Sequence, residues 1–334
     1  MNHPPILIAC VAILTFTGTF ATAQEEGIYI ATGHGLHRVA SNDGRTWTNH
    51  VFEGEPSHNQ NDLAAIAVGN GVCVTVGGYF KSNIYVTDDG VNWQKPDFNI
   101  GVLSGVIFDG DRFLVFGQGG RVAESKDGLN WEKVGDAEAR DYLKEEAEKL
   151  GLEKGIKSNI RMWAEANGVY VGAGDNSMIV STDDLENWHF AERVEPHARL
   201  RLASNGERFV VGGKKNLYWS EDGKNWNLAA EIPMENEKDK FTDIDWDGER
   251  FIASTKETTW ESPDGKSWTQ LDVKEFPRFF SLIRPDLYYG FKNYWQETDK
   301  LLVSTDGGKT WEATEIPAPL GVTNVIHAPE IEKF

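Results

Sequence analysis

Short hydrophobic runs separated by polar turns fill most of the chain. One such unit consists of Val106–Asp109, a glycine-containing turn, Arg112–Phe116, a second glycine turn, and Arg121–Ser125. The same order recurs over Ala65–Val76 and over Asp243–Ala253. Hydrophobic runs of this length, bounded by Asn-Gly or Asp-Gly pairs, are typical of β-strands joined by tight hairpins. We therefore predict an all-β chain whose strands come in repeated sets of four, which we name A to D from the inside outward.

A polar turn that ends in tryptophan occurs seven times and sets the repeat. Each copy carries a hydroxyl residue, an aspartate, usually a glycine, and then the tryptophan. The aspartates and tryptophans are Asp43 and Trp47, Asp89 and Trp93, Asp127 and Trp131, Asp183 and Trp188, Asp222 and Trp226, Asp264 and Trp268, and Asp306 and Trp311. Successive tryptophans lie 38 to 57 residues apart, the period of propeller blades. The hydroxyl and carboxylate are expected to accept hydrogen bonds from the turn's own amides, and the tryptophan to pack between neighbouring sheets.

The most complete copy, from Ser304 to Trp311, reads Ser-Thr-Asp-Gly-Gly-Lys-Thr-Trp. This pattern resembles the Asp-box, or bacterial neuraminidase repeat, of sialidases, sortilin-type receptors, some endoglucanases and photosystem II assembly factors. The resemblance implies a β-propeller in which the motif lies away from the ligand face, and it implies no particular activity. We predict one domain over residues 24–334, a seven-bladed β-propeller of four-stranded antiparallel blades.

The two ends of the repeat region are complementary. Gly27 to Val51 supply strands B, C and D with no strand A before them, whereas Gly321 to Ala328 supply a strand A with nothing after it. The two ends are therefore expected to complete one blade, which closes the ring and removes exposed sheet edges.

The 57-residue gap between two tryptophans contains an insertion over residues 136–158. Its hydrophobic residues recur at helical spacing, at Ala139, Leu143, Ala147 and Leu150. With Asp136 able to cap the start and Gly151 the end, the pattern predicts an amphipathic helix. It follows a strand D, so it is either a rim insertion or a lid or wall of a binding site.

The chain begins with features of an export signal. Ile6 to Phe20 is mainly apolar, and Ala21-Thr22-Ala23 precedes Gln24 as a small-x-small cleavage site. Residues 1–23 are predicted to be a signal peptide cleaved after Ala23, which makes the protein secreted or periplasmic, and no later segment is apolar enough to cross a membrane. The mature chain retains one cysteine, Cys73, which we expect to be a buried strand residue.

Charge and histidine spacing exclude several function classes. The 52 acidic residues outnumber the 33 basic ones and give a net charge of -19, which disfavours nucleic acids and anionic membranes as partners. The eight histidines show no metal-binding spacing, so no metal or cofactor is predicted.

Candidate binding residues lie where loops of the ligand face are expected. Arginines at or near the start of strands A are Arg161, Arg199, Arg201 and Arg278, and Arg121 follows a B-to-C loop. They either converge on an anion such as a carboxylate or form separate ion pairs with the abundant acidic residues. Tyr294 and Trp295 either stack on a ligand or pack within a blade. Weak candidates for acid/base catalysis are Asp62, Glu55, His58 and Glu275.

Two functions from different classes follow. Sialidases carry an early Phe/Tyr-Arg-Ile-Pro motif, three carboxylate-binding arginines and a catalytic Tyr, and that motif is missing from this sequence. The favoured hypothesis is an exported non-catalytic propeller that binds a glycan, peptide or protein partner on its loop face. The alternative is a sialidase-like glycoside hydrolase that acts on an acidic glycan, so the sequence leaves open whether the protein is an enzyme.

Overall fold

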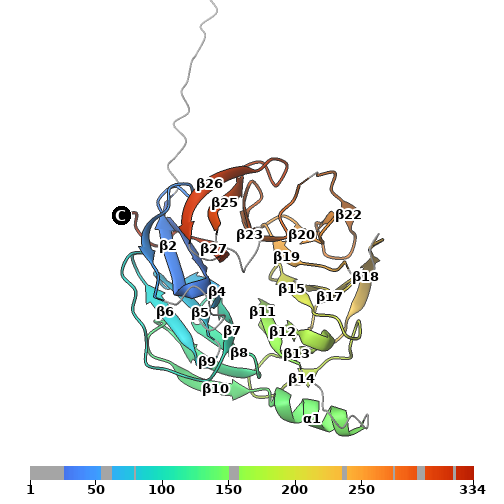
Figure 1. Cartoon of the computed structure of the whole chain (residues 1–334). Helices are drawn as coiled ribbons and strands as arrows, with labels where there is room; N and C mark the ends of the chain where they lie inside the picture. The colour runs from blue at the N-terminus through green and yellow to red at the C-terminus, as the bar shows by residue number, and fades with distance from the viewer. Residues whose placement is uncertain are drawn as a thin grey trace, which may run out of the picture.

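The computed structural model describes residues 26–53, 62–78, 80–149, 158–234, 239–273, 275–291, 298–318 and 321–334. Its strands form seven antiparallel sheets arranged around a central axis (Figure 1). The chain is therefore a seven-bladed β-propeller, as the repeated turns predict.

Six blades contain four strands each. From the axis outward, the blade that holds both chain ends contains β27 (Val322–Ala328), β1 (Ile28–Gly33), β2 (His37–Ser41) and β3 (Thr48–Val51), and two further blades contain β7 (Leu103–Phe108), β8 (Phe113–Gly117), β9 (Arg121–Ser125) and β10 (Glu132–Asp136), and β11 (Ile160–Ala166), β12 (Val169–Gly174), β13 (Ile179–Thr182) and β14 (His189–Phe190). The other three contain, in the same order, β15 (Arg201–Ser204), β16 (Phe209–Gly212), β17 (Asn216–Ser220) and β18 (Asn227–Glu231); β19 (Asp243–Trp246), β20 (Phe251–Ser254), β21 (Thr259–Ser262) and β22 (Thr269–Gln270); and β23 (Phe279–Arg284), β24 (Leu287–Phe291), β25 (Thr298–Ser304) and β26 (Glu312–Ala318).

The remaining blade differs from the predicted four strands. It contains β4 (Leu63–Gly69), β5 (Val72–Gly77) and β6 (Asn83–Thr87), and its outer edge is a single bridge between Val86 and Gln94. Cys73 lies in β5 and is fully buried, as predicted.

The first and last strands close the ring. β27 pairs antiparallel with β1, with Ile28 opposite Ala328 and Ala31 opposite Val325. The prediction that the two ends share one blade is confirmed. Because β27 also packs against β4 and β23, the inner strands form an unbroken circle in the order β27, β4, β7, β11, β15, β19 and β23.

The repeated turns are held by their own side chains. In the first copy, Ser41 Oγ accepts the N–H of Gly44 at 2.9 Å, and Asp43 Oδ1 accepts the N–H groups of Arg45 and Thr46 at 2.8 and 2.7 Å. Gly44 has a φ of 71°, in the region that glycine tolerates best. Each turn thus satisfies its own polar groups and fixes the start of the strand that follows.

The fourth turn corrects one residue of the prediction. Asp184, not Asp183, accepts the N–H groups of Glu186 and Asn187, at 2.9 and 2.7 Å, and bonds the hydroxyl of Thr182. Two adjacent aspartates made the register ambiguous in the sequence. Leu185 takes the glycine position with a φ of 64° and is buried.

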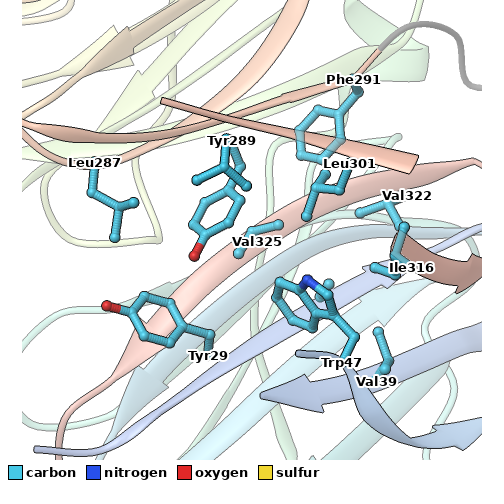
Figure 2. Packing of buried hydrophobic residues seen from close by; sticks show 12 residues of the cluster. Tyr29, Val39, Trp47, Leu287, Tyr289, Phe291, Leu301, Ile316, Val322 and Val325 are labelled. Atoms are coloured by element: carbon cyan, nitrogen blue, oxygen red, sulfur yellow. The ribbon is translucent and has the colours of Figure 1, made fainter. Parts of the chain in front are cut away.

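Each tryptophan of a repeated turn packs against the preceding blade. Trp47, for example, joins a cluster with Tyr289 and Leu301 of the last blade, and its ring centroid lies 6.1 Å from that of Tyr289 (Figure 2). The six other tryptophans lie in the corresponding inter-blade clusters. Burying such rings is a large apolar contribution in an otherwise polar chain.

One inter-blade contact contains a buried cation. Arg38 has no exposed surface, and its guanidinium carbon lies 3.8 Å from the ring centroid of Tyr85 in the next blade. Nη2 of Arg38 lies 2.9 Å from Glu53 Oε1, and Tyr85 donates to the other carboxylate oxygen at 3.0 Å. The cation–π contact and the hydrogen bond from Tyr85 to Glu53 therefore join the first two blades of the chain.

The helical insertion lies on the outside of the ring. α1 (Ala139–Lys149) buries Ala139, Leu143 and Ala147, and Asp136 accepts the N–H of Glu138 at 3.1 Å just before it. The rest of the predicted segment, with Leu150 and Gly151, lies outside the described residues. The buried face packs against β13 and β14, and Tyr142 stacks on Phe190 with centroids 3.9 Å apart. No described residue of α1 lines the channel cavity, so the helix is a rim insertion.

The role of Asp184 in the fourth turn can be tested by substitution. Asp184→Ala removes a carboxylate that accepts two main-chain N–H groups, so we expect the thermal midpoint to fall by a few degrees. Asp183→Ala is the matched control, because Asp183 is exposed and makes none of these bonds. Equal midpoints for the two variants would contradict the assignment of Asp184.

Candidate functional site

A cavity of about 440 Å³ opens at the end of the channel where the inner strands begin. Every inner strand contributes its first or second residue to the lining: Ala64, Leu103, Arg161, Arg201, Asp243, Phe280 and Thr323. B-to-C connections add His34, Gly78 and Gln118, and D-to-A connections add Asp62 and Arg199. The repeated turns join strands C and D and therefore lie at the opposite end of the blades.

Two of the predicted arginines share one carboxylate. Asp175 lies in the short 3-10 helix Asp175–Ser177, between β12 and β13. Arg161 Nε donates to Asp175 Oδ2 at 2.8 Å, and Nη2 of Arg161 lies 2.8 Å from the same oxygen. Arg199 Nε lies 3.5 Å from Asp175 Oδ1. Asp175 thus neutralises part of the charge and fixes the direction of the Arg161 guanidinium, whose Nη1 has no hydrogen bond to the described residues.

The third arginine is held by main chain. Nε of Arg201 donates to the carbonyl oxygen of Thr242, immediately before β19. The Nη groups of Arg201 make no hydrogen bond within the described part of the chain. Because a guanidinium carries five N–H donors, fixing Nε leaves the other donors for an acceptor in the cavity.

Two aspartates on β19 line the cavity, and Asp243 interacts with Arg201. Asp243 accepts the main-chain N–H of Phe280, and Asp245 accepts that of Leu282, each at 2.9 Å, so both carboxyl groups link β19 to β23. Burial raises the pKa of Asp243 to about 7, although Arg201 and the Phe280 N–H oppose the shift. Burial likewise raises the pKa of Asp245 to about 6, against the N–H groups of Leu282 and Trp246.

A third carboxyl group lines another part of the wall. The main-chain carbonyl of Asp62 accepts the N–H of Gly78 at 3.0 Å, and a Cβ on Gly77 would lie 1.9 Å from that oxygen, so the close approach requires glycine. Asp62 Oδ1 lies 3.4 Å from His34 Nδ1. Burial raises the pKa of the Asp62 carboxyl, and His34 and the N–H of Leu63 oppose this shift.

The other predicted site residues do not line the cavity. Arg278 is exposed just before β23, and Glu275 is exposed in the preceding loop. Arg121, at the start of β9, is half-buried beside Gly101. The predictions for Glu55, His58, Tyr294 and Trp295 fall outside the described residues.

Sequence reasoning missed Asp243, Asp245 and His34 as lining residues. The run Asp243-Ile-Asp-Trp246 predicts a strand, as the sequence pattern of the blades requires. A signal was nevertheless present, because residues two apart on a strand point to the same face. Two aspartates so placed on an inner strand predict a pair of carboxyl groups at the channel.

The described residues contain neither a metal site nor a membrane-spanning helix. No group of three or more His, Cys, Asp or Glu side chains there is arranged to hold a metal ion. Within the same residues, no helix has the length and apolarity needed to span a membrane.

No family model and no curated protein matches the chain, whereas several solved structures do. It is similar to YCF48 from Cyanidioschyzon merolae, with 12% identity and a TM-score of 0.54 over 92% of this chain and 97% of that one. A second structure is titled "YCF48 bound to D1 peptide", with 16% identity and a TM-score of 0.53 over 79% of this chain and 91% of that one. The WD40 propeller domain of Doa1 matches with 13% identity and a TM-score of 0.50, over 80% and 92%. The fold is that of the β-propeller proteins.

The raised pKa of Asp243 gives a stability prediction. A carboxyl with a pKa of about 7 in the folded chain and 3.8 as its ordinary value binds more protons when folded, so stability falls as pH rises from about 4 to about 7. Asn at this position is neutral and can still accept the N–H of Phe280. At pH 8 we expect Asp243→Asn to be more stable than wild type by on the order of 1 kcal/mol, with a smaller difference at pH 5.

Chemical unfolding at the two pH values measures this difference. Asp272→Asn, at an exposed position, is the matched control and should change little at either pH. If the effect of Asp243→Asn were the same at pH 5 and pH 8, the raised pKa would be contradicted.

Proposed function

We propose that the protein is an exported, non-catalytic propeller that binds a peptide or protein partner on the face around the cavity mouth. One observation carries the proposal: Arg161, Arg199 and Arg201 converge on a single cavity to which all seven inner strands contribute. The partner group held there is an anion, most simply a carboxylate. Export follows from the predicted signal peptide over residues 1–23.

The arginine arrangement supports carboxylate binding. Asp175 holds Arg161, and the Thr242 carbonyl holds Arg201, both through Nε. Two guanidinium groups with fixed orientations bind a planar carboxylate at a smaller entropic cost than mobile side chains do. Peptide binding is also supported by a neighbour of the same fold that was solved with a peptide bound.

An array of short peptides tests the proposal. Each peptide is present in two forms, one with a free carboxyl terminus and one with a carboxyl-terminal amide. For the tightest binder, we expect Arg161→Gln and Arg201→Gln each to weaken the affinity about ten-fold or more, because a charge-assisted hydrogen bond is lost. The measurement is isothermal titration calorimetry.

Arg45→Gln is the control with the same change in charge. Arg45 lies in a repeated turn at the other end of the blades and pairs with Glu312, so its loss should not change binding. Equal affinity of wild type, Arg161→Gln and Arg201→Gln for every bound peptide would contradict the proposal.

A sialidase-like hydrolase is the second candidate, favoured by one observation. Asp243 shares the cavity with Arg201, and its pKa of about 7 suits a general acid. However, no tyrosine is among the described residues that line the cavity, whereas sialidases use a tyrosine nucleophile.

We expect no hydrolysis of 4-methylumbelliferyl N-acetylneuraminic acid above the rate without protein, because no described residue that lines the cavity is a tyrosine. Release of the fluorophore measures this directly. Turnover that Asp243→Asn abolishes, while Asp272→Asn retains it, would instead favour the hydrolase over the binding protein.

A further inference from the structure

The cavity carries opposite charges on walls that face each other. Arg201 is the first residue of β15, and Asp62 immediately precedes β4. In the ring of inner strands, β15 is three places from β4 in one direction and four in the other, which is as far as seven strands allow. Figure 1 shows β4 and β15 on opposite sides of the axis.

The three aspartates of the cavity differ in the hydrogen bonds that their carboxyl groups already accept. Asp243 and Asp245 accept main-chain N–H groups of β23, and Asp243 is also adjacent to Arg201. Asp62 Oδ1, by contrast, is buried and accepts no hydrogen bond from the described residues. His34 Nδ1 lies 3.4 Å from this oxygen, which is longer than an ordinary hydrogen bond.

A buried carboxylate oxygen without a donor gains the most from a cation that enters with a ligand. Desolvation already penalises the charged form of Asp62, as the raised pKa of this carboxyl shows. An ammonium group would supply the missing donor to Oδ1 and a positive charge beside the carboxylate.

We propose that the cavity recognises a bipolar ligand, whose carboxylate binds at Arg161 and Arg201 and whose ammonium group binds at Asp62. This inference rests on the proposed function and specifies the class of group that enters the cavity. The ligand is either a short free peptide or the end of a longer chain with a basic residue near its carboxyl terminus.

The size of the cavity agrees with this class of ligand. A sphere of about 440 Å³ is about 9 Å across. Three extended residues span about 10 Å, so the two termini of a tripeptide can reach both walls.

Three probes of similar size separate the two charges. They are trialanine, with both charges; N-acetyl-trialanine, with the carboxylate alone; and trialaninamide, with the ammonium alone. At pH 7, an α-amino group with a pKa of about 8 is mostly charged. We expect trialanine to bind more tightly than either blocked form in calorimetric titrations.

The variant Asp62→Asn gives the decisive comparison. It should weaken the binding of trialanine about ten-fold and leave N-acetyl-trialanine within two-fold of wild type, because only trialanine brings the ammonium group. Retained binding of the acetylated probe also shows that the variant is folded. Arg201→Gln should weaken both of these probes.

Each contrary result has a different meaning. If Asp62→Asn weakens trialanine and N-acetyl-trialanine equally, or neither, the bipolar assignment is overturned while arginine-dependent binding stands. If Arg201→Gln weakens neither probe, or neither probe binds at millimolar concentration, the proposed function falls as well.

A fourth probe, N-acetyl-Lys-Ala-Ala, distinguishes the two sources of the ligand. It has a blocked amino terminus, a lysine ammonium group and a free carboxylate. Tighter binding of this probe than of trialanine assigns the end of a longer chain, and the reverse order assigns a free peptide. Sensitivity of both probes to Asp62→Asn supports the charge pattern in either case.

Discussion

The pairing of β27 with β1 is the contact on which the rest of the molecule depends. It joins segments almost 300 residues apart and turns seven separate sheets into a closed ring. Closure protects the inner strand edges that would otherwise be exposed, and it sets the distances across the channel. The cavity exists as one site only because every inner strand is held in this circle.

Polar side chains complete the circle near the axis. Beyond the bonds of Asp243 and Asp245 to β23, Ser281 Oγ accepts the N–H of Val325 at 3.0 Å, and Thr323 donates to the carbonyl of Leu63 at 2.8 Å. These bonds link neighbouring inner strands where their main-chain groups have no partner within a sheet. The residues that give the cavity its polarity therefore also hold the blades together, so the electrostatics of the site and the rigidity of the ring cannot be changed independently.

The fold was largely predictable because its signal repeats, whereas the site was predictable only in part. A turn that uses Ser41, Asp43 and Trp47 has the same physical requirement in every blade, and the one misplaced residue, Asp183, arose where two aspartates were adjacent. Arg161, Arg199 and Arg201 were found because the start of an inner strand must lie at the mouth. Arg278 lies just before an inner strand, as predicted, but it does not line the cavity, because the direction of a side chain just before a strand is set by packing. Asp243 and Asp245 were missed because their alternation was interpreted as strand pattern alone.

The local charge of the cavity contrasts with that of the whole chain. A net charge of -19 attracts basic partners and repels acidic ones at long range, but at physiological ionic strength this field decays over about 8 Å. The arginines of the mouth therefore act only on a group that has already reached the cavity. The proposed ligand, which carries both charges, would satisfy the two requirements in turn, since its cation would be drawn to the acidic surface before its carboxylate reached Arg161 and Arg201. The acidic composition of the chain and its cluster of arginines are thus compatible features of the proposed binding surface.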